Sequence, residues 1–282
     1  MASSPPAASG HRIEVHGHRG ARARFPENTL PAFAHALQQG VDWIELDLVV
    51  TADDALAVMH DPVLNPLICS RADGSAAPDG WLVREHTLAE LQAFDCGRLR
   101  HPRFAQQQTV PGTPVPTLDE VIALVERSPS PTSRSVQLNV ELKLVPGLPR
   151  QAPTPERFAA LAVDCLRRHG MVQRSQIQSF DHRALAAVRK LEPALRLAAL
   201  VDETHPDLVA LARAVGAGTV APHQRWLTAE DVAALHRARI RVVPWTVNDA
   251  ADWQRLADWG VDGIISDDPA ALIAFLRQRG LR

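Results

Sequence analysis

Short apolar runs alternate with longer amphipathic segments along almost the whole chain, and this alternation limits the fold more than any other feature. The strand-like runs cover 13–16, 41–50, 55–60, 135–144, 175–180, 195–201, 219–221, 240–246 and 263–266. Helical patterns cover 29–39, 117–127, 154–169, 181–191, 205–215, 228–239, 249–259 and 269–278. If 55–60 is an extra strand that pairs with the strand at 41–50, the other strands and the helices form eight β-then-α units. That count and order predict an α/β fold, a (β/α)8 TIM barrel.

One long segment interrupts this rhythm. Residues 61–116 follow the second unit, where a barrel places a βα loop, and they contain seven prolines and scattered glycines. A loop of this length inside a compact domain usually has a function. We therefore predict an insertion at 61–116, after the second strand. Residues 12–282 are expected to form a single barrel domain that includes this insertion, and residues 1–11 a disordered tail.

Composition excludes some classes of protein and partner. Thirty Lys and Arg residues against 32 Asp and Glu residues, with no long run of one sign, argue against a nucleic-acid partner. No apolar run approaches the roughly 20 residues of a membrane span, so we expect no stable membrane insertion. The N-terminal residues lack the pattern of a signal peptide. We expect a cytoplasmic protein, or a periplasmic one if a leader has been removed; the sequence does not indicate an oligomeric state.

Three cysteines, Cys69, Cys96 and Cys165, are too few and too irregularly spaced for a disulfide framework or a zinc site. We predict free thiols in a reducing compartment. The alternative is a single Cys69–Cys96 bridge in an exported protein.

Charged side chains lie inside two apolar strands. Glu45 and Asp47 are two apart in the second strand, and Glu141 and Lys143 are two apart in the third unit, so each pair shares a face. A single pair of this kind could be solvated or bound to arginines. Here the flanking residues are apolar, so the charges are expected to be buried, and an unpaired buried charge is costly in free energy. Catalytic groups of a barrel lie at the carboxyl ends of its strands. Three carboxylates meeting there predict a hard divalent cation, Mg²⁺ or Ca²⁺.

Two histidines at strand ends suit acid–base catalysis. His18 follows the first strand and His60 ends the extra strand, and imidazole titrates near neutrality. His16, on the same strand face as His18, and His223, after the sixth strand, are the competing candidates. Arg19, directly after His18, could bind a phosphate through paired hydrogen bonds.

An ordered set of nine short motifs resembles the glycerophosphodiester phosphodiesterase family over about residues 15–269. The motifs are His18-Arg19-Gly20, Pro26-Glu27-Asn28-Thr29, Glu45-Leu46-Asp47, His60-Asp61, Pro116-Thr117-Leu118, Glu141-Leu142-Lys143, Ser179-Phe180, Trp245-Thr246-Val247-Asn248 and Gly260-Val261-Asp262-Gly263-Ile264-Ile265-Ser266-Asp267. The sequence departs from the family at Pro62-Val63-Leu64, where many members carry Arg-Thr-Thr, and at Ser266, where Thr is commoner.

The resemblance implies a TIM barrel with an insertion after its second strand, and hydrolysis of a small glycerophosphodiester to sn-glycerol 3-phosphate and an alcohol, through a cyclic phosphate. It assigns the acid–base pair to His18 and His60, the divalent cation to Glu45, Asp47 and Glu141, and phosphate binding to Arg19 and Lys143.

Phe180 and Trp245 are expected to pack against the glycerol carbons, with the alcohol half of the substrate facing the insertion. Three alternatives stay open. They are a phospholipase D-like or phospholipase C-like barrel acting on lipid phosphodiesters, a barrel that binds phosphodiesters without catalysis, and a barrel with unrelated chemistry.

Overall fold

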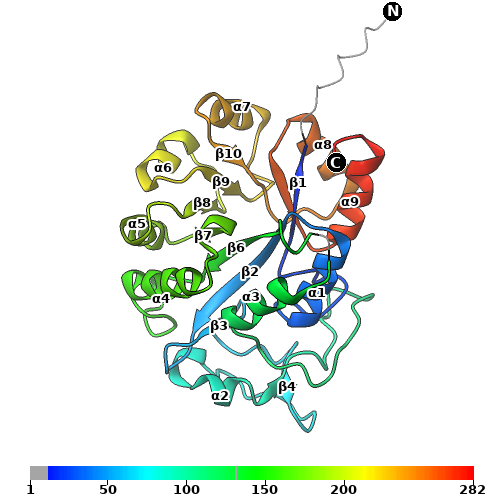
Figure 1. Ribbon diagram of the computed structural model, residues 1–282, viewed down its shortest axis with the longest axis vertical. Helices are drawn as coiled ribbons and strands as arrows, with labels where there is room; N and C mark the ends of the chain where they lie inside the picture. The colour runs from blue at the N-terminus through cyan, green and yellow to red at the C-terminus, as the bar shows by residue number, and fades with distance from the viewer. Residues whose placement is uncertain (1–11, 131) are drawn as a thin grey trace, which may run out of the picture.

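The computed structural model describes residues 12–130 and 132–282 as a barrel of parallel strands. Neighbouring strands follow the order β10-β9-β8-β7-β6-β2-β1-β11 (Figure 1). Their bounds are β1 Glu14–Gly17, β2 Trp43–Val50, β6 Gln137–Leu142, β7 Ser175–Ser179, β8 Arg196–Val201, β9 Thr219–Pro222, β10 Arg241–Val242 and β11 Gly263–Ser266. The predicted (β/α)8 TIM barrel is confirmed.

The barrel closes between β10 and β11 through backbone hydrogen bonds that are not part of a regular ladder. The Ile265 N–H donates to the Pro244 carbonyl (3.0 Å), and the Val247 N–H donates to the Ile265 carbonyl (2.9 Å). β10 is shorter than the predicted 240–246 because Pro244 has no N–H to give to a ladder.

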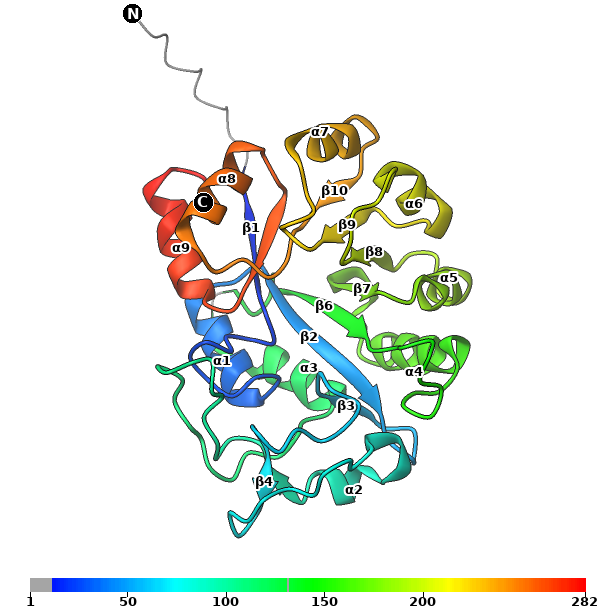
Figure 2. The ribbon, with the colours of Figure 1, turned by 180° about the vertical axis from the view of Figure 1, so that it is seen from behind.

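Helices cover the outside of the strands (Figures 1 and 2). They are α1 Leu30–Gln39, α3 Leu118–Arg127, α4 Pro155–Arg168, α5 His182–Leu191, α6 Leu208–Val215, α7 Ala229–Arg237, α8 Ala250–Asp258 and α9 Pro269–Gln278, with a short 3₁₀ turn at Val172–Arg174. A Thr or Asp side chain caps the first turn of each of these α-helices. Because Asp207 is the cap, α6 begins at Leu208, three residues after the predicted start at 205.

The insertion packs beside α3 and extends from one side of the barrel (Figure 2). The extra strand β3, Leu56–Val58, pairs antiparallel with β2, as the sequence predicted. β4 (Ser70–Arg71) then pairs with β5 (Phe94–Asp95), and between them lie a 3₁₀ turn (Val83–Glu85) and α2 (Leu88–Leu91). These elements share an apolar cluster separate from that of the barrel, so the insertion has its own small core.

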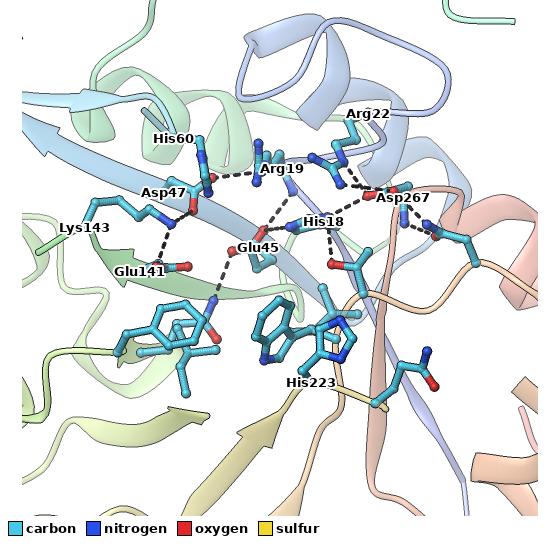
Figure 3. A pocket seen from close by; sticks show the side chains of 18 of the residues that line it. His18, Arg19, Arg22, Glu45, Asp47, His60, Glu141, Lys143, His223 and Asp267 are labelled. Atoms are coloured by element: carbon cyan, nitrogen blue, oxygen red, sulfur yellow. Dashed lines mark hydrogen bonds and ion pairs between the residues drawn. The ribbon is translucent and has the colours of Figure 1, made fainter. Parts of the chain in front are cut away.

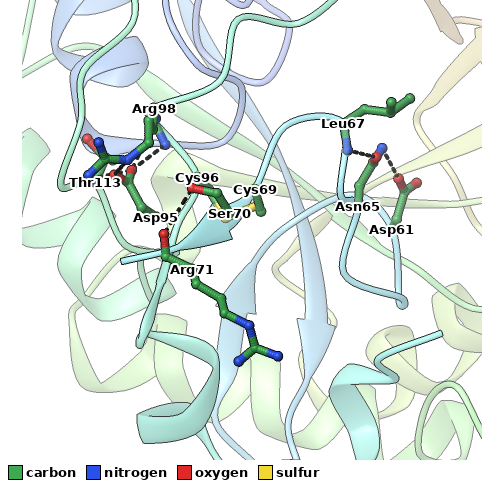
Figure 4. The surroundings of a disulfide bond; sticks show 11 residues. Asp61, Asn65, Leu67, Cys69, Ser70, Arg71, Asp95, Cys96, Arg98 and Thr113 are labelled. Carbon is green, nitrogen blue, oxygen red and sulfur yellow. Dashed lines mark hydrogen bonds and ion pairs between the residues drawn. A yellow bond between two sulfur atoms is a disulfide. The ribbon is translucent and has the colours of Figure 1, made fainter. Parts of the chain in front are cut away.

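A disulfide joins Cys69 to Cys96 within the insertion (Figure 4). The β4–β5 pairing sets Ser70 opposite Asp95 and thereby brings the two neighbouring cysteines together. The prediction of free thiols is therefore wrong for Cys69 and Cys96. Cys165 is free and buried in α4.

Two further predictions concern the ends of the chain and membranes. The disordered tail predicted for residues 1–11 lies outside the described residues. In the described part of the chain, each helix is too short or too polar to cross a bilayer.

Candidate active site

A pocket of about 350 Å³ opens at the carboxyl ends of the barrel strands (Figure 3). This is the end where barrel enzymes carry their catalytic groups. All nine residues that the sequence analysis placed in the site line it: His18, Arg19, Glu45, Asp47, His60, Glu141, Lys143, Phe180 and Trp245.

The turn after β1 positions the first catalytic candidates. Arg19 (φ 50°) and Gly20 (φ 87°) both adopt the left-handed conformation, and a Cβ on Gly20 would lie 2.7 Å from the backbone of Ala32 in α1. A glycine is therefore required there. The turn sends the Arg19 N–H to the Glu45 carboxylate (2.8 Å to Oε2) and places His18 beside it.

Three buried carboxylates form the floor of the pocket. Glu45 and Asp47 come from β2 and Glu141 from β6; Asp47 and Glu141 are register partners, and none is more than 6% exposed. One oxygen from each lies within 4.8 Å of the others. Burial, and then the charges of Asp47 and Glu141, raise the pKa of Glu45 well above its usual value; burial also raises the pKa of Glu141. This all-oxygen set is unstable as three anions and fits a hard divalent cation.

Two cations lie against these carboxylates. The Lys143 Nζ is 2.8 Å from Glu141 Oε1 and 3.6 Å from Asp47 Oδ1, and the Arg19 Nε is 3.2 Å from Asp47 Oδ2. Burial would raise the pKa of Asp47, but the charges of Arg19 and Lys143 hold it well below its usual range. Asn28 also donates an amide hydrogen bond to Asp47 (2.8 Å). Asp47 therefore stays ionised.

His18 is held by a carboxylate that the candidate set from the sequence did not include. Its Nδ1 lies 2.6 Å from Asp267 Oδ1, and Asp267 also accepts from the Arg22 guanidinium (2.5 Å) and the Asn248 amide (2.7 Å). Burial, and then the Arg22 charge, lower the pKa of His18 to about 4 although Asp267 opposes them. A neutral imidazole that donates from Nδ1 leaves a lone pair on Nε2, which faces Glu45 at 3.9 Å.

Asp267 could have been found from the sequence because it follows the last strand directly, and strand ends carry the catalytic groups. Arg22 had no such signal, since it lies in a loop.

His60 has a similar but more exposed carboxylate partner. Its Nδ1 is 2.6 Å from Asp61 Oδ1, and the Asn65 amide donates to the other oxygen of Asp61 (3.1 Å). The hydrogen bond from His60 lowers the pKa of Asp61 despite partial burial. The Asp61 carboxylate thus orients the imidazole, as Asp267 does for His18.

The two competing histidines occupy different positions. His16 is 1% exposed, does not line the pocket, and stacks on Trp43 (ring centroids 5.0 Å apart). Burial lowers the pKa of His16 to about 3. His223 does line the pocket, edge-on to Trp245 at 4.9 Å. The Trp245 ring in turn meets Phe180, so these aromatic residues form one wall of the pocket.

A chain of buried amides runs through the barrel interior to the floor. Thr219 Oγ1 donates to Gln176 (3.1 Å), and Gln176 donates to Asn139 (3.1 Å). Asn139 donates to Gln178 (2.9 Å), whose Nε2 donates to Glu45 Oε1 (3.0 Å). Every donor in the chain points toward Glu45, so the chain fixes the orientation of this carboxylate and stabilises its charge. The sequence analysis did not include the members of this amide chain among its candidate residues.

Known proteins resemble the chain in both sequence and structure. The model of the Glycerophosphoryl diester phosphodiesterase family matches residues 18–271. A glycerophosphodiester phosphodiesterase from Caldanaerobacter subterraneus is 30% identical over 94% of this chain and 98% of its own, and one from Bacillus altitudinis is 32% identical over 91% and 95%.

Among solved structures, one from Silicibacter pomeroyi has a TM-score of 0.89 and 31% identity, covering 96% of this chain and 95% of that chain. An Oleispira antarctica phosphodiesterase in complex with the product sn-glycerol-3-phosphate has a TM-score of 0.77 and 26% identity, covering 94% and 97%.

Proposed function

The chain belongs to the glycerophosphoryl diester phosphodiesterase family, and from that premise we propose that it hydrolyses small glycerophosphodiesters to sn-glycerol 3-phosphate and an alcohol. The observation that carries this proposal is the convergence of three carboxylates, two cations and two carboxylate-held imidazoles in one pocket. The product complex of the O. antarctica relative supports a glycerol phosphate as product.

Glu45, Asp47 and Glu141 would hold a divalent cation, Mg²⁺ or Ca²⁺. When bound, this cation supplies positive charge that stabilises the negative charge developing on the phosphate oxygens. Arg19 and Lys143, which lie against these carboxylates, bind the phosphate of the substrate.

The two histidines move the protons. His18, with its Nε2 lone pair free, takes the proton of the glycerol 2-hydroxyl, and that oxygen attacks the phosphorus. The bond from phosphorus to the alcohol oxygen breaks, and His60 protonates the leaving alkoxide. A water molecule then opens the resulting cyclic phosphate, with the two imidazoles exchanging roles. Phe180, 40% exposed, and Trp245 pack against the glycerol carbons.

The lipid-directed alternatives have less support. A long exposed apolar surface on the insertion would support a lipid substrate. Of the described residues in the insertion, Leu67 is the only exposed large apolar side chain, at 62%. The non-catalytic alternative gains nothing from the structure either, since both imidazoles keep oriented carboxylate partners.

The Cys69–Cys96 disulfide supports the periplasmic rather than the cytoplasmic alternative for location. Disulfides persist in oxidising compartments and are rare in the cytosol.

The test is release of sn-glycerol 3-phosphate from a panel of glycerophosphodiesters, before and after chelation. We expect turnover that chelation abolishes and that Mg²⁺ or Ca²⁺ restores. Full activity after exhaustive chelation would refute the role of the carboxylate cluster. Failure to release glycerol phosphate from every diester would refute the proposed function.

A further inference from the structure

Two arginines at the mouth of the pocket stand apart from the cations at its floor. Arg103, in the insertion, and Arg225, in the loop after β9, line the pocket and are exposed. Among residues 12–130 and 132–282, neither has a carboxylate within ion-pair distance. Arg19, Arg22 and Lys143, the other cations of the lining, each contact one or more carboxylates.

Arg103 is held over the site by a buried anchor. Gln107, four residues later, is 2% exposed, and its amide donates to the carbonyls of Arg22 (2.7 Å) and Phe25 (3.0 Å) in the β1–α1 loop. The Arg22 guanidinium also lies 5.4 Å from the centre of the Phe104 ring. These contacts dock this part of the insertion onto the loop that carries the proposed catalytic residues, and the Arg103 guanidinium lies 6.0 Å from the centre of the Phe104 ring.

Arg225 lies in the loop after β9, which is attached to neighbouring residues of the pocket. Its N–H donates to Nδ1 of His223 (3.2 Å), and the neighbouring Gln224 N–H donates to the Trp245 carbonyl (3.0 Å). The loop is thereby attached to the aromatic wall of the pocket.

The charges of the pocket do not balance around a simple diester. Four carboxylates line the pocket (Glu45, Asp47, Glu141 and Asp267) against five cationic side chains. Arg19, Lys143 and a bound divalent cation carry four positive charges. Glu45, Asp47, Glu141 and Glu27, which contacts Arg19, balance these charges, and Arg22 is balanced by Asp267. The single negative charge of a diester with a neutral alcohol half therefore balances one of the two arginines at the mouth, and the other remains without an anion.

We propose that Arg103 and Arg225 form an anion-binding subsite for the alcohol half of the substrate. The inference rests on the proposed function, because the 2-hydroxyl must reach the floor and the alcohol half then extends toward the mouth. The preferred substrates are glycerophosphodiesters whose alcohol carries its own negative charge, a carboxylate or a second phosphate. A quaternary ammonium headgroup is disfavoured by the same charges.

The test compares glycerophosphoserine with glycerophosphoethanolamine, which differ only by one carboxylate, and adds a diester with a second phosphate. We expect kcat/KM to be about tenfold higher for the two anionic substrates than for the ethanolamine diester. Arg103→Gln and Arg225→Gln should each lower this ratio about threefold, and the double variant should bring it near one. Arg237→Gln, which removes an exposed arginine from α7, is the matched control and should leave the ratio unchanged.

Three results would overturn the subsite. The first is a kcat/KM ratio of anionic to ethanolamine substrate near one in the unmodified protein, and the second is a ratio that ionic strength does not change. The third is an equal loss of kcat/KM for all substrates in the arginine variants, because it indicates only long-range attraction. Binding to a His18→Ala protein, measured by titration calorimetry with the same diesters, gives the affinity ratio without turnover. Absence of hydrolysis with an intact affinity ratio would refute the proposed function and leave the subsite standing.

Discussion

Removal of the Cys69–Cys96 disulfide should destabilise the protein by a predictable amount. The bridge closes a loop with a sequence separation of 27. The loop-closure entropy for that length gives a stabilisation of about 3.5 kcal/mol at 25 °C. We therefore expect the Cys69→Ser/Cys96→Ser protein to lose about that much free energy of unfolding.

Hydrogen bonds also link the disulfide to Asp61, the carboxylate beside the proposed acid His60 (Figure 4). The Cys69 N–H donates to the Asn65 carbonyl (2.9 Å), and the Asn65 side chain donates to Asp61, the partner of His60. Loss of the bridge loosens this support, so we expect kcat to fall more than KM changes.

The assay is urea unfolding of the unmodified and double-serine proteins, with and without reductant. For a slope near 3 kcal/mol/M, the midpoint should fall by about 1 M. Reductant should lower the urea midpoint of the unmodified protein to that of the variant and leave the midpoint of the variant unchanged. An unfolded, unreduced sample should titrate as one thiol per chain, that of Cys165. Three titratable thiols, or a midpoint that ignores reductant, would refute the reasoning.

Three further predictions address the site and the barrel interior. His18→Ala and His60→Ala should each lower kcat about 10²- to 10⁴-fold, whereas His16→Phe, which keeps the stack on Trp43, should change kcat only slightly; steady-state kinetics decide, and an equal loss for His16→Phe would contradict the assignment. Gln178→Leu removes a donor to Glu45 and should weaken divalent-cation binding about tenfold in calorimetric titration; an unchanged affinity would show that the amide chain does not matter to the ion. Because burial lowers the pKa of His16 to about 3, the folded state disfavours its protonation, so stability is full above pH 6.5 and falls by up to about 1.4 kcal/mol per pH unit between pH 6.5 and 3. His16→Phe should flatten that part of the stability curve, measured by urea unfolding at several pH values, and identical slopes would exclude His16 as the cause.

The order of strands and helices could be predicted from the sequence because burial leaves a periodic pattern in it. Strands covered on both faces appear in the sequence as continuous apolar runs without alternation, and helices show their caps and amphipathic spacing. The family prediction is likewise confirmed, because its motifs keep their order along the chain. Most candidate residues lie together because they lie in or shortly after parallel strands, whose carboxyl ends meet on one face of a barrel. His60 is the exception, since it follows the antiparallel strand β3, which pairs with β2.

Contacts between distant segments needed the tertiary structure. The Asp267 that holds His18 is 249 residues away, and β1 and β11 must be neighbours before the two can meet. The irregular path of the insertion decides that Cys69 faces Cys96 and that Arg103 reaches the pocket.

The sequence by itself thus determined in what order the elements follow and which strands carry the candidate carboxylates and imidazoles, with the exception of Asp267. Only the tertiary structure decided which carboxylate holds which imidazole, which cysteines pair and which arginines at the pocket have no carboxylate beside them among the described residues. The physical reason is that periodicity reports how a residue's own segment is buried. Its partner depends on strand register and on the path of loops, and neither leaves a local pattern in the chain.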